Sequence, residues 1–288
     1  MTPTLPGAAY ELLAPTAAFA LSALHARRAL GASRAAGELV VLVAYGYALE
    51  WVAIAVFASH EYGASWRAAP GGVPLAVAVT WAAVIASAMA IAARLAASPL
   101  ARAAAAALTG ISLDLLMEPV AVRAGLWAWT PPGPWLAVPV GNFVGWAVIV
   151  GAYTFGAERW SASGTLADEA LRRVALGVSA VVALLAVGFL WRRLDAESAF
   201  AGAAAWLVAG LALAATVVLA SRGPLPPDPG PGLAARLGAA PGRLPGAVLL
   251  LLAAFFATDA LLMGDPRLAA VAFGSLLALG TVAWRAAT

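Results

Sequence analysis

The sequence predicts an all-α integral membrane protein, a single domain of residues 1–288 built as a bundle of eight or nine transmembrane helices. Hydrophobic residues make up 63% of the chain and charged residues only 11%, about half the charge of a soluble domain. The apolar residues occur in runs of roughly twenty, the length at which a helix crosses a bilayer. These two observations together place the chain in a membrane.

The few charged and metal-binding residues exclude several classes of function. All 17 basic residues are arginines, and they stand singly or in pairs between apolar runs. This pattern indicates membrane topology rather than a nucleic-acid-binding stripe. Cysteine is absent and histidine occurs twice, so disulfides, thiolate metal sites and multi-histidine metal centres are excluded. We expect neither a metal nor a nucleic-acid partner.

Nine hydrophobic segments are predicted along the chain. They cover residues 9–26, 37–58, 73–97, 100–118, 138–157, 172–191, 198–220, 245–263 and 268–285. The last two are short and are joined by the turn Gly264-Asp265-Pro266. They could instead form one hairpin that does not cross fully, which leaves eight or nine crossings.

The arginines predict how the segments are oriented. If the N-terminus lies outside, the inner loops and the C-terminal tail receive twelve arginines and the outer loops five. The positive-inside rule then places the C-terminus in the cytoplasm of a bacterial cell, with the chain in the cytoplasmic membrane. The Pro- and Gly-rich stretch 221–245 is predicted to be a flexible cytoplasmic linker. His25, beside Arg27 and Arg28, is predicted to face a loop.

Two carboxylates four residues apart mark the fourth segment. On a helix, Asp114 and Glu118 lie on one face, one turn apart, and Pro119 is predicted to end the helix. Acids inside a membrane are costly, so the pair indicates a functional site. The structural alternative is that both acids cap the helix or form a salt bridge within the bundle, for example to Arg123.

Other polar and aromatic residues are expected to converge on the same outer pocket, within about residues 40–160. They are Glu50, His60, Tyr62, Trp127, Trp129 and Asn142. Each has a structural alternative as well. Glu50 could bond a neighbouring tyrosine, His60 could be an ordinary interfacial residue, and the tryptophans could form an interfacial belt. Asp259 is a further membrane acid, without predicted neighbours of chemical interest.

This set of residues suits acid chemistry on an alkene. A carboxyl in a dry pocket has a raised pKa and can donate a proton at neutral pH. The resulting tertiary cation can be stabilised by aromatic faces and by a second, ionised carboxylate. Acid-initiated hydration, cyclisation or isomerisation of a polyene lipid needs no cofactor.

Three motifs also resemble a known family. They are Asp114-Leu-Leu-Met-Glu118-Pro119-Val-Ala, then Gly125-Leu-Trp127-Ala-Trp129, then Val138-Pro139-x-Gly141-Asn142-Phe143-x-Gly145-Trp146. In this combination the chain resembles the membrane-bound carotenoid biosynthesis proteins, which include carotenoid 1,2-hydratases. Upstream, Glu50 and His60-x-Tyr62 resemble the family more loosely. The resemblance covers roughly residues 40–160.

The resemblance implies that water adds to the terminal 1,2 double bond of an acyclic carotenoid, such as lycopene or γ-carotene, giving a tertiary 1-hydroxy carotenoid. Asp114 or Glu118 would donate the proton and the other would orient water or balance the cation, while Glu50 would supply a catalytic hydrogen bond. The substrate would be bound by Trp127, Trp129, Asn142, Phe143, Trp146, His60 and Tyr62. The partners implied are the polyene, the lipid bilayer and other carotenoid-pathway enzymes.

Three other functions fit the same residues. A carotenoid end-ring cyclase or isomerase would use the same protonation without adding water. A membrane transporter would use Asp114, Glu118 and Glu50 as a proton relay. A carotenoid-binding protein would need the aromatic residues alone.

Overall fold

The structure, a computed structural model, describes residues 5, 9–159, 165–200, 202–221, 232–240 and 242–288. The described residues form ten α-helices, three short helices of other types and two short strands. The α-helices are α1 (Ala14–Leu30), α2 (Ala32–Ala55), α3 (Leu75–Leu95), α4 (Pro99–Arg123), α5 (Val140–Arg159), α6 (Leu166–Arg193), α7 (Ala203–Ser221), α8 (Leu233–Ala239), α9 (Leu244–Leu262) and α10 (Pro266–Ala287). The remaining elements are η1 (Ala9–Leu13), β1 (His60–Tyr62), η2 (Pro70–Gly72), β2 (Trp127–Trp129) and η3 (Ala196–Phe200).

The predicted all-α membrane bundle is confirmed, and each predicted hydrophobic segment overlaps one helix. Within the described residues, seven helices are long and apolar enough to cross a membrane: α2 to α6, α9 and α10. The segment in α7 is a shorter apolar helix, and α1 has 17 residues. The last two segments are separate helices, because Gly264 adopts a φ of 68° and the Asp265 side chain caps α10.

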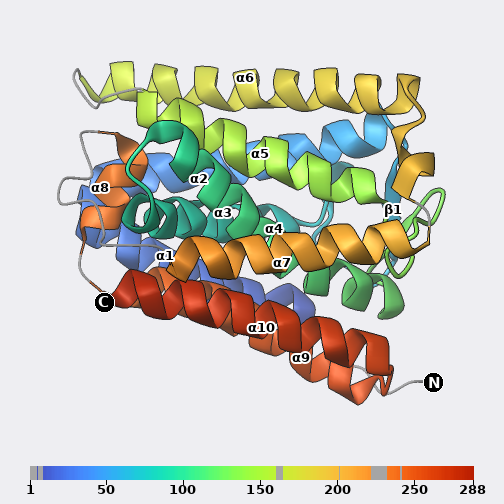
Figure 1. The fold of residues 1–288 in the computed structure, drawn as a ribbon. Coiled ribbons are helices and arrows are strands. Elements are labelled where there is room, and N and C mark those ends of the chain that lie inside the picture. The colour runs from blue at the N-terminus through green and yellow to red at the C-terminus, as the bar shows by residue number, and fades with distance from the viewer. Residues whose placement is uncertain (1–4, 6–8, 160–164, 201, 222–231, 241) are drawn as a thin grey trace.

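The helices lie roughly side by side, with α6 along one side of the bundle and α9 and α10 along the opposite side (Figure 1). The apolar stretch of α4 is 83% buried, against 17% for α6, so α4 is central and α6 is peripheral. Close packing in the centre depends on small residues. A side chain at Gly46 of α2 would place its Cβ 2.6 Å from Cβ of Trp81 on α3.

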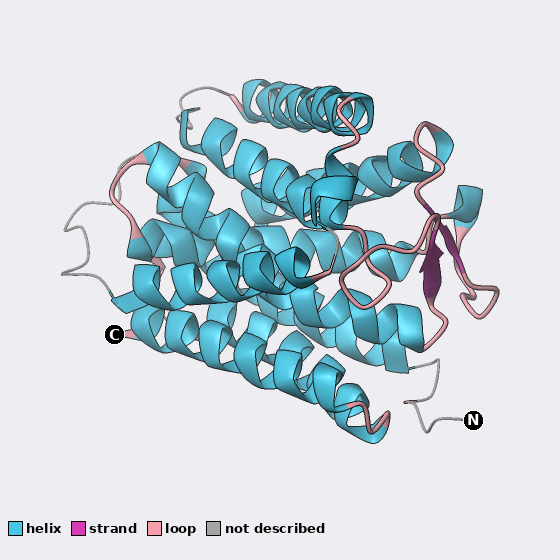
Figure 2. Cartoon of the chain, turned by 45° about the vertical axis from the view of Figure 1, so that its right-hand side comes forward, coloured by secondary structure: helices cyan, strands magenta, loops and turns pink. Residues whose placement is uncertain are grey.

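The two ends of the bundle are different. The strands β1 and β2 lie at one end (Figure 2), and α8 lies at the other with the last turn of α10. Helix α8 falls within the predicted linker 221–245. Its Ala234, Ala235 and Leu237 are buried and the helix packs on α3, so residues 233–239 are a packed element rather than an extended connection. Residues 222–231 and 241 lie outside the described residues.

The prediction that Pro119 ends the fourth helix is wrong, because α4 continues to Arg123. Proline has no N–H to give to the carbonyl of Leu115, one turn earlier. The indole N–H of Trp135 donates to that carbonyl instead, at 3.1 Å. The last turn also brings Arg123 to Asp265, at 2.8 Å, rather than to the acid pair of its own helix.

Two further predictions on polar residues are wrong. His25 is buried within α1 rather than facing a loop, and its Nε2 lies 2.9 Å from the carbonyl oxygen of Leu237 in α8. Asp259 is fully buried in α9 and has two donors, the backbone N–H of Leu5 at 2.9 Å and the hydroxyl of Tyr10. Both partners come from segments distant in sequence, which local patterns do not place.

Candidate active site

A two-stranded antiparallel sheet brings four aromatic side chains to one face. β1 pairs with β2 in antiparallel register, with His60 opposite Trp129 and Tyr62 opposite Trp127. Because side chains alternate along a strand, these four share one face and Glu61 lies on the other. The rings of His60 and Trp129 are 4.9 Å apart, and those of Tyr62 and Trp127 are 5.8 Å apart. The spacing His60-x-Tyr62 and Trp127-x-Trp129 is thus a strand pattern.

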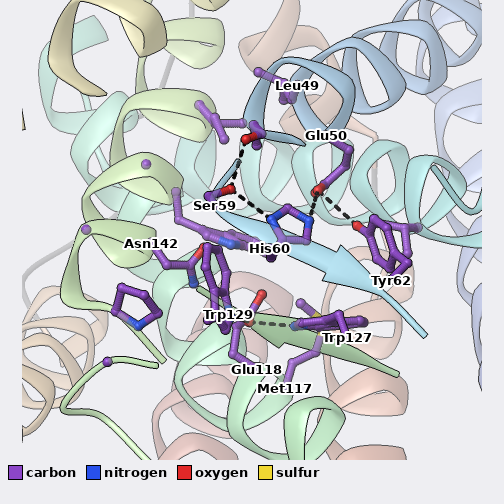
Figure 3. Close-up of a pocket in the computed structure, with 18 of the residues that line it drawn as sticks. Leu49, Glu50, Ser59, His60, Tyr62, Met117, Glu118, Trp127, Trp129 and Asn142 are labelled. Carbon is purple, nitrogen blue, oxygen red and sulfur yellow. Dashed lines mark hydrogen bonds and ion pairs between the residues drawn. The ribbon is translucent and has the colours of Figure 1, made fainter. Parts of the chain in front are cut away.

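Glu118 lies beneath this sheet and is held by its tryptophans. Its Oε2 accepts from the indole N–H of Trp127 at 2.9 Å and from that of Trp129 at 2.8 Å. The tryptophans therefore do more than form an interfacial belt, because both aim their only polar group at a buried acid. Figure 3 shows Glu118 beside Trp127 and Trp129, with His60 and Tyr62 of β1 above them.

Asp114 lies one turn further into the bundle. Its Oδ2 accepts from the amide of Asn142, in the first turn of α5, at 2.7 Å. Its Oδ1 is buried and has no hydrogen-bond partner within the described residues. Asp114 is fully buried and Glu118 is 6% exposed, so the two acids of one helix face have different surroundings.

Glu50 on α2 forms the second half of the site. Its Oε1 accepts from the indole N–H of Trp81 at 2.6 Å. Its Oε2 accepts from the hydroxyl of Tyr62 at 2.9 Å and lies 3.2 Å from Nε2 of His60. The alternative in which Glu50 bonds a tyrosine is correct as a contact, but the tyrosine is one of three partners.

Ser59 fixes the proton on the far side of the His60 ring. The Ser59 hydroxyl donates to the carbonyl of Ala53 at 3.0 Å and lies 3.0 Å from Nδ1 of His60. A hydroxyl has one proton, so Ser59 must accept from Nδ1–H. The remaining mobile proton of this group then lies between Nε2 of His60 and Oε2 of Glu50 (Figure 3).

The two titratable residues of β1 are shifted by this environment. Burial alone would lower the pKa of His60, but the hydrogen bond and negative charge of Glu50 outweigh it and raise that pKa above its usual value. Burial raises the pKa of Tyr62 far above its usual value, and the charge of Glu50 adds to the effect. Tyr62 is therefore a neutral hydrogen-bond donor, and His60 holds its second proton more tightly than a free histidine.

These groups border a cavity of about 390 Å³, within the size range of small-molecule sites. Most of the predicted site residues line it: Glu50, His60, Tyr62, Glu118, Trp127, Trp129, Asn142 and Trp146. Asp114 and Phe143 do not line it. Asp114 stands behind Asn142, and Phe143 is buried in the helical core.

Several residues that line the cavity were not predicted from the sequence to belong to the site. Ser59 and Trp81 contact the predicted acid and histidine directly. Glu197 on η3 also lines the cavity and accepts from the backbone N–H groups of Val140 and Gly141 at the start of α5. The position of Trp81 in an apolar segment opposite Glu50 could have indicated its role. No local sequence pattern indicates Glu197.

The charge balance of the site is unusual for a membrane interior. Within the described residues, no arginine forms an ion pair with Glu50, Asp114 or Glu118. Their partners are indole, amide, phenol and imidazole donors. No group of three or more histidine, aspartate or glutamate side chains in the described part of the chain has metal-site spacing. The arrangement can hold a proton beside apolar and aromatic surfaces.

Comparison with known proteins gives one match. The model of the family described as "Carotenoid biosynthesis protein" matches residues 7–219, which is more than half of the chain and includes all the acids and aromatics of the candidate site. No curated protein and no solved structure matches the chain significantly.

Proposed function

The chain belongs to the carotenoid biosynthesis protein family, and from this premise we propose that it is a carotenoid 1,2-hydratase. The substrate class is an acyclic carotenoid end group, as in lycopene or γ-carotene. The observation that carries the proposal is Glu118, a buried acid at the wall of an aromatic cavity, held by two tryptophan N–H groups and, in the part of the chain that the structure describes, by no arginine.

In the proposed reaction, the Glu118 carboxyl gives its proton to C2 of the terminal double bond. The π bond breaks, a C–H bond forms at C2 and a tertiary cation forms at C1. The ring faces of Trp127 and Trp129 stabilise this cation, and their N–H groups stabilise the new Glu118 carboxylate. The aromatic pair thus acts on both products of the proton transfer.

Water then adds to C1 and loses a proton, so that a C–O bond forms and a tertiary alcohol results. We assign this proton to the Glu50–His60 pair, which already shares one proton between Oε2 and Nε2. Trp129 stands between the two halves of the site, because its ring packs on His60 and its N–H reaches Glu118. Return of this proton from the Glu50–His60 pair to Glu118 restores both groups, so the net reaction consumes one water and no proton, and it requires no cofactor.

Asp114 would act as a positioning residue. It does not line the cavity, but it holds the Asn142 amide that does. Asn142 is thereby turned so that its carbonyl oxygen is free to accept from a bound water. Asp114 also places a second acid one turn from Glu118, where the two carboxyls resist being ionised together.

The experiment is expression in a lycopene-accumulating bacterium, with the pigments analysed by liquid chromatography and mass detection. We expect a more polar pigment that is one or two waters heavier and has an unchanged chromophore spectrum. A product of unchanged mass would overturn hydration in favour of cyclisation or isomerisation. Unaltered lycopene and γ-carotene would favour transport or simple binding.

The orientation in the membrane is a separate part of the proposal. It places the site at the outer end of the bundle and the C-terminus in the cytoplasm, because the α8 end has more arginines than the β1 end. A reporter protein that works only in the cytoplasm should then be active when it is fused after Thr288. If a reporter that works only outside the cytoplasm is active at this position instead, the proposed orientation is reversed.

A further inference from the structure

The cavity extends across the bundle rather than ending at the acids. Its lining includes Leu184, Val187 and Trp191 on α6 and Leu252 and Phe256 on α9. Helix α6 packs on α2 and α5, whereas α9 packs on α1, α3, α4 and α10. Figure 1 shows the two helices on opposite sides of the molecule. The acids and the strand aromatics therefore stand between two apolar ends of one cavity.

The α6 end lies at the edge of the bundle. Leu184, Val187 and Trp191 are half-buried, and the neighbouring Val182 and Phe189 of the same helix are more than half exposed. In a membrane, these exposed apolar side chains face lipid. A linear carotenoid is larger than the ligands that a cavity of about 390 Å³ encloses, so its polyene must leave the cavity, and this end borders the lipid.

The α9 end is enclosed. Leu252 is 1% exposed, Tyr10 5% and Phe256 7%. The Tyr10 ring meets the Phe255 ring edge-on at 5.1 Å and the Phe256 ring at 6.2 Å. No polar side chain of α9 lines this end, so its chemistry suits a hydrocarbon group and gives water no partner.

Asp259 holds this wall in place. It lies one turn beyond Phe255, is fully buried and is the acceptor for the Tyr10 hydroxyl. The same carboxylate accepts from the backbone N–H of Leu5 at 2.9 Å. Asp259 therefore joins the segment before α1 to α9, and Tyr10 has its ring fixed at the cavity wall by its own hydroxyl.

We propose that the α9 end is a closed subsite for the terminal hydrocarbon of the carotenoid, and that Phe256, with Tyr10 fixed by Asp259, sets the largest end group accepted. The proposal rests on the proposed hydratase function. It places the reacting double bond beside Glu118, the alkyl groups of C1 toward Phe256, and the polyene past α6 into lipid. Phe256 and Tyr10 are specificity residues here, and Asp259 is a positioning residue.

The test compares two substrates of one purified full-length protein in liposomes: lycopene, and a lycopene analogue whose two terminal methyl groups are replaced by ethyl groups. One methylene in an apolar pocket changes selectivity by about tenfold or more. Phe256→Ala should therefore raise the analogue-to-lycopene rate ratio about tenfold, and Phe256→Trp should lower it. Tyr10→Phe, which releases the ring from Asp259, should shift the ratio in the same direction as Phe256→Ala, by less.

The matched control is Leu184 at the open end. Leu184→Ala and Leu184→Trp should change both rates together and leave their ratio unaltered. An unchanged ratio in both Phe256 variants, or an equal shift in the Leu184 variants, would overturn the subsite. Phe256→Leu provides a milder variant that keeps the test valid if Phe256→Ala does not fold.

Failure of the hydratase function gives a different result. If the wild-type protein converts neither pigment, hydration is wrong, and the subsite is then judged by binding. Quenching of tryptophan fluorescence by each pigment gives the two affinities. Phe256→Ala should still raise the relative affinity for the analogue about tenfold, and an unchanged affinity ratio would refute the subsite on its own.

Discussion

Acids are buried at both ends of the bundle, but the two groups have different partners. At the α8 end, Glu38 is 2.9 Å from Arg173, Glu158 is 2.6 Å from Arg102, and Glu169 lies between Arg34 and Arg173. At the β1 end, the donors to Glu118 and Asp114 among the described residues are N–H groups of tryptophan and asparagine. The carboxylates of Glu38, Glu158 and Glu169 are thus paired with arginines, whereas those of Glu118 and Asp114 are left to neutral donors.

The difference separates acids that are paired with a fixed positive charge from acids that could transfer a proton. A buried carboxylate paired with arginine is fixed in its ionised form and cannot give a proton at low cost. A buried carboxyl among neutral donors can exist in either form, which is what proton transfer to an alkene requires. Burial alone therefore does not identify a candidate catalytic acid: Glu118 also lines the cavity and, among the described residues, has no arginine partner.

The largest effect on product formation should come from removing the transferable proton of Glu118. Glu118→Gln keeps the shape of the side chain but has no such proton. We expect hydrated product to fall at least about 100-fold, with the protein still in the membrane. Chromatography of extracted pigments measures it. Glu61→Gln is the control, because Glu61 lies in the same sheet but is exposed. Full activity of Glu118→Gln would end the assignment.

The matching change at the α8 end should affect stability instead. Arg102→Met leaves Glu158 buried without its partner, and loss of one member of a buried pair costs about 3–5 kcal/mol. Unfolding of the detergent-solubilised protein should show this loss, while activity per folded molecule stays unchanged. Arg27→Met, at an exposed position, should stay within about 0.5 kcal/mol of wild type. A selective loss of activity in Arg102→Met would contradict the division between the two ends.

A smaller effect is expected from one tryptophan N–H. Trp129→Phe keeps an aromatic ring but removes the donor to Glu118. A hydrogen bond to a charged group contributes about 1.5–3 kcal/mol, so we expect the rate to fall about tenfold or more. Trp135→Phe removes a comparable N–H from Leu115 and should lower stability by about 1 kcal/mol without changing the rate. Equal rate losses in both variants would show that the hydrogen bond from Trp129 to Glu118 has no specific role in the reaction.

The smallest effect concerns pH and His60. The raised pKa of His60 in the folded protein means that its pair with Glu50 stabilises the fold fully below the histidine's unfolded pKa. This contribution is lost as the pH rises through the raised pKa. The difference in melting temperature between wild type and His60→Gln should therefore be largest in mild acid and shrink at alkaline pH. A difference that grows with pH would contradict the proton shared between His60 and Glu50.

Much of the helical fold was predictable, because runs of apolar residues mark helices directly. The spacing of Asp114 and Glu118 predicted one helix face, and both residues do lie on α4. The sequence did not predict that this helix passes through Pro119, since the Trp135 side chain that satisfies the freed carbonyl comes from a later loop. When the hydrogen-bond partner of a helix carbonyl comes from a distant part of the sequence, local rules predict the wrong residue for the end of the helix.

The convergence of most candidate residues on one cavity was predictable, but its geometry was not. Glu50, His60 and Glu118 were expected to converge, yet the three-residue strands that align them are too short for a recognisable strand pattern. Their pairing joins residues 60–62 to residues 127–129, across two helices. Ser59 was missed because its role, to fix one proton of His60, depends on the carbonyl of Ala53 that it bonds.

The pairing of β1 with β2 also determines when the site can form during biogenesis. The helices of a membrane protein first insert and afterwards associate, but these strands lie beyond the ends of α2 and α4. His60 can meet Trp129 only after both helices have formed and the ends that carry the strands have come together. A ribosome that has released only α1 to α3 has produced Glu50 and His60 without Glu118. The strand pairing above Glu118 can therefore form only after α4 and β2 have been made, while α5 to α10 still follow in the chain.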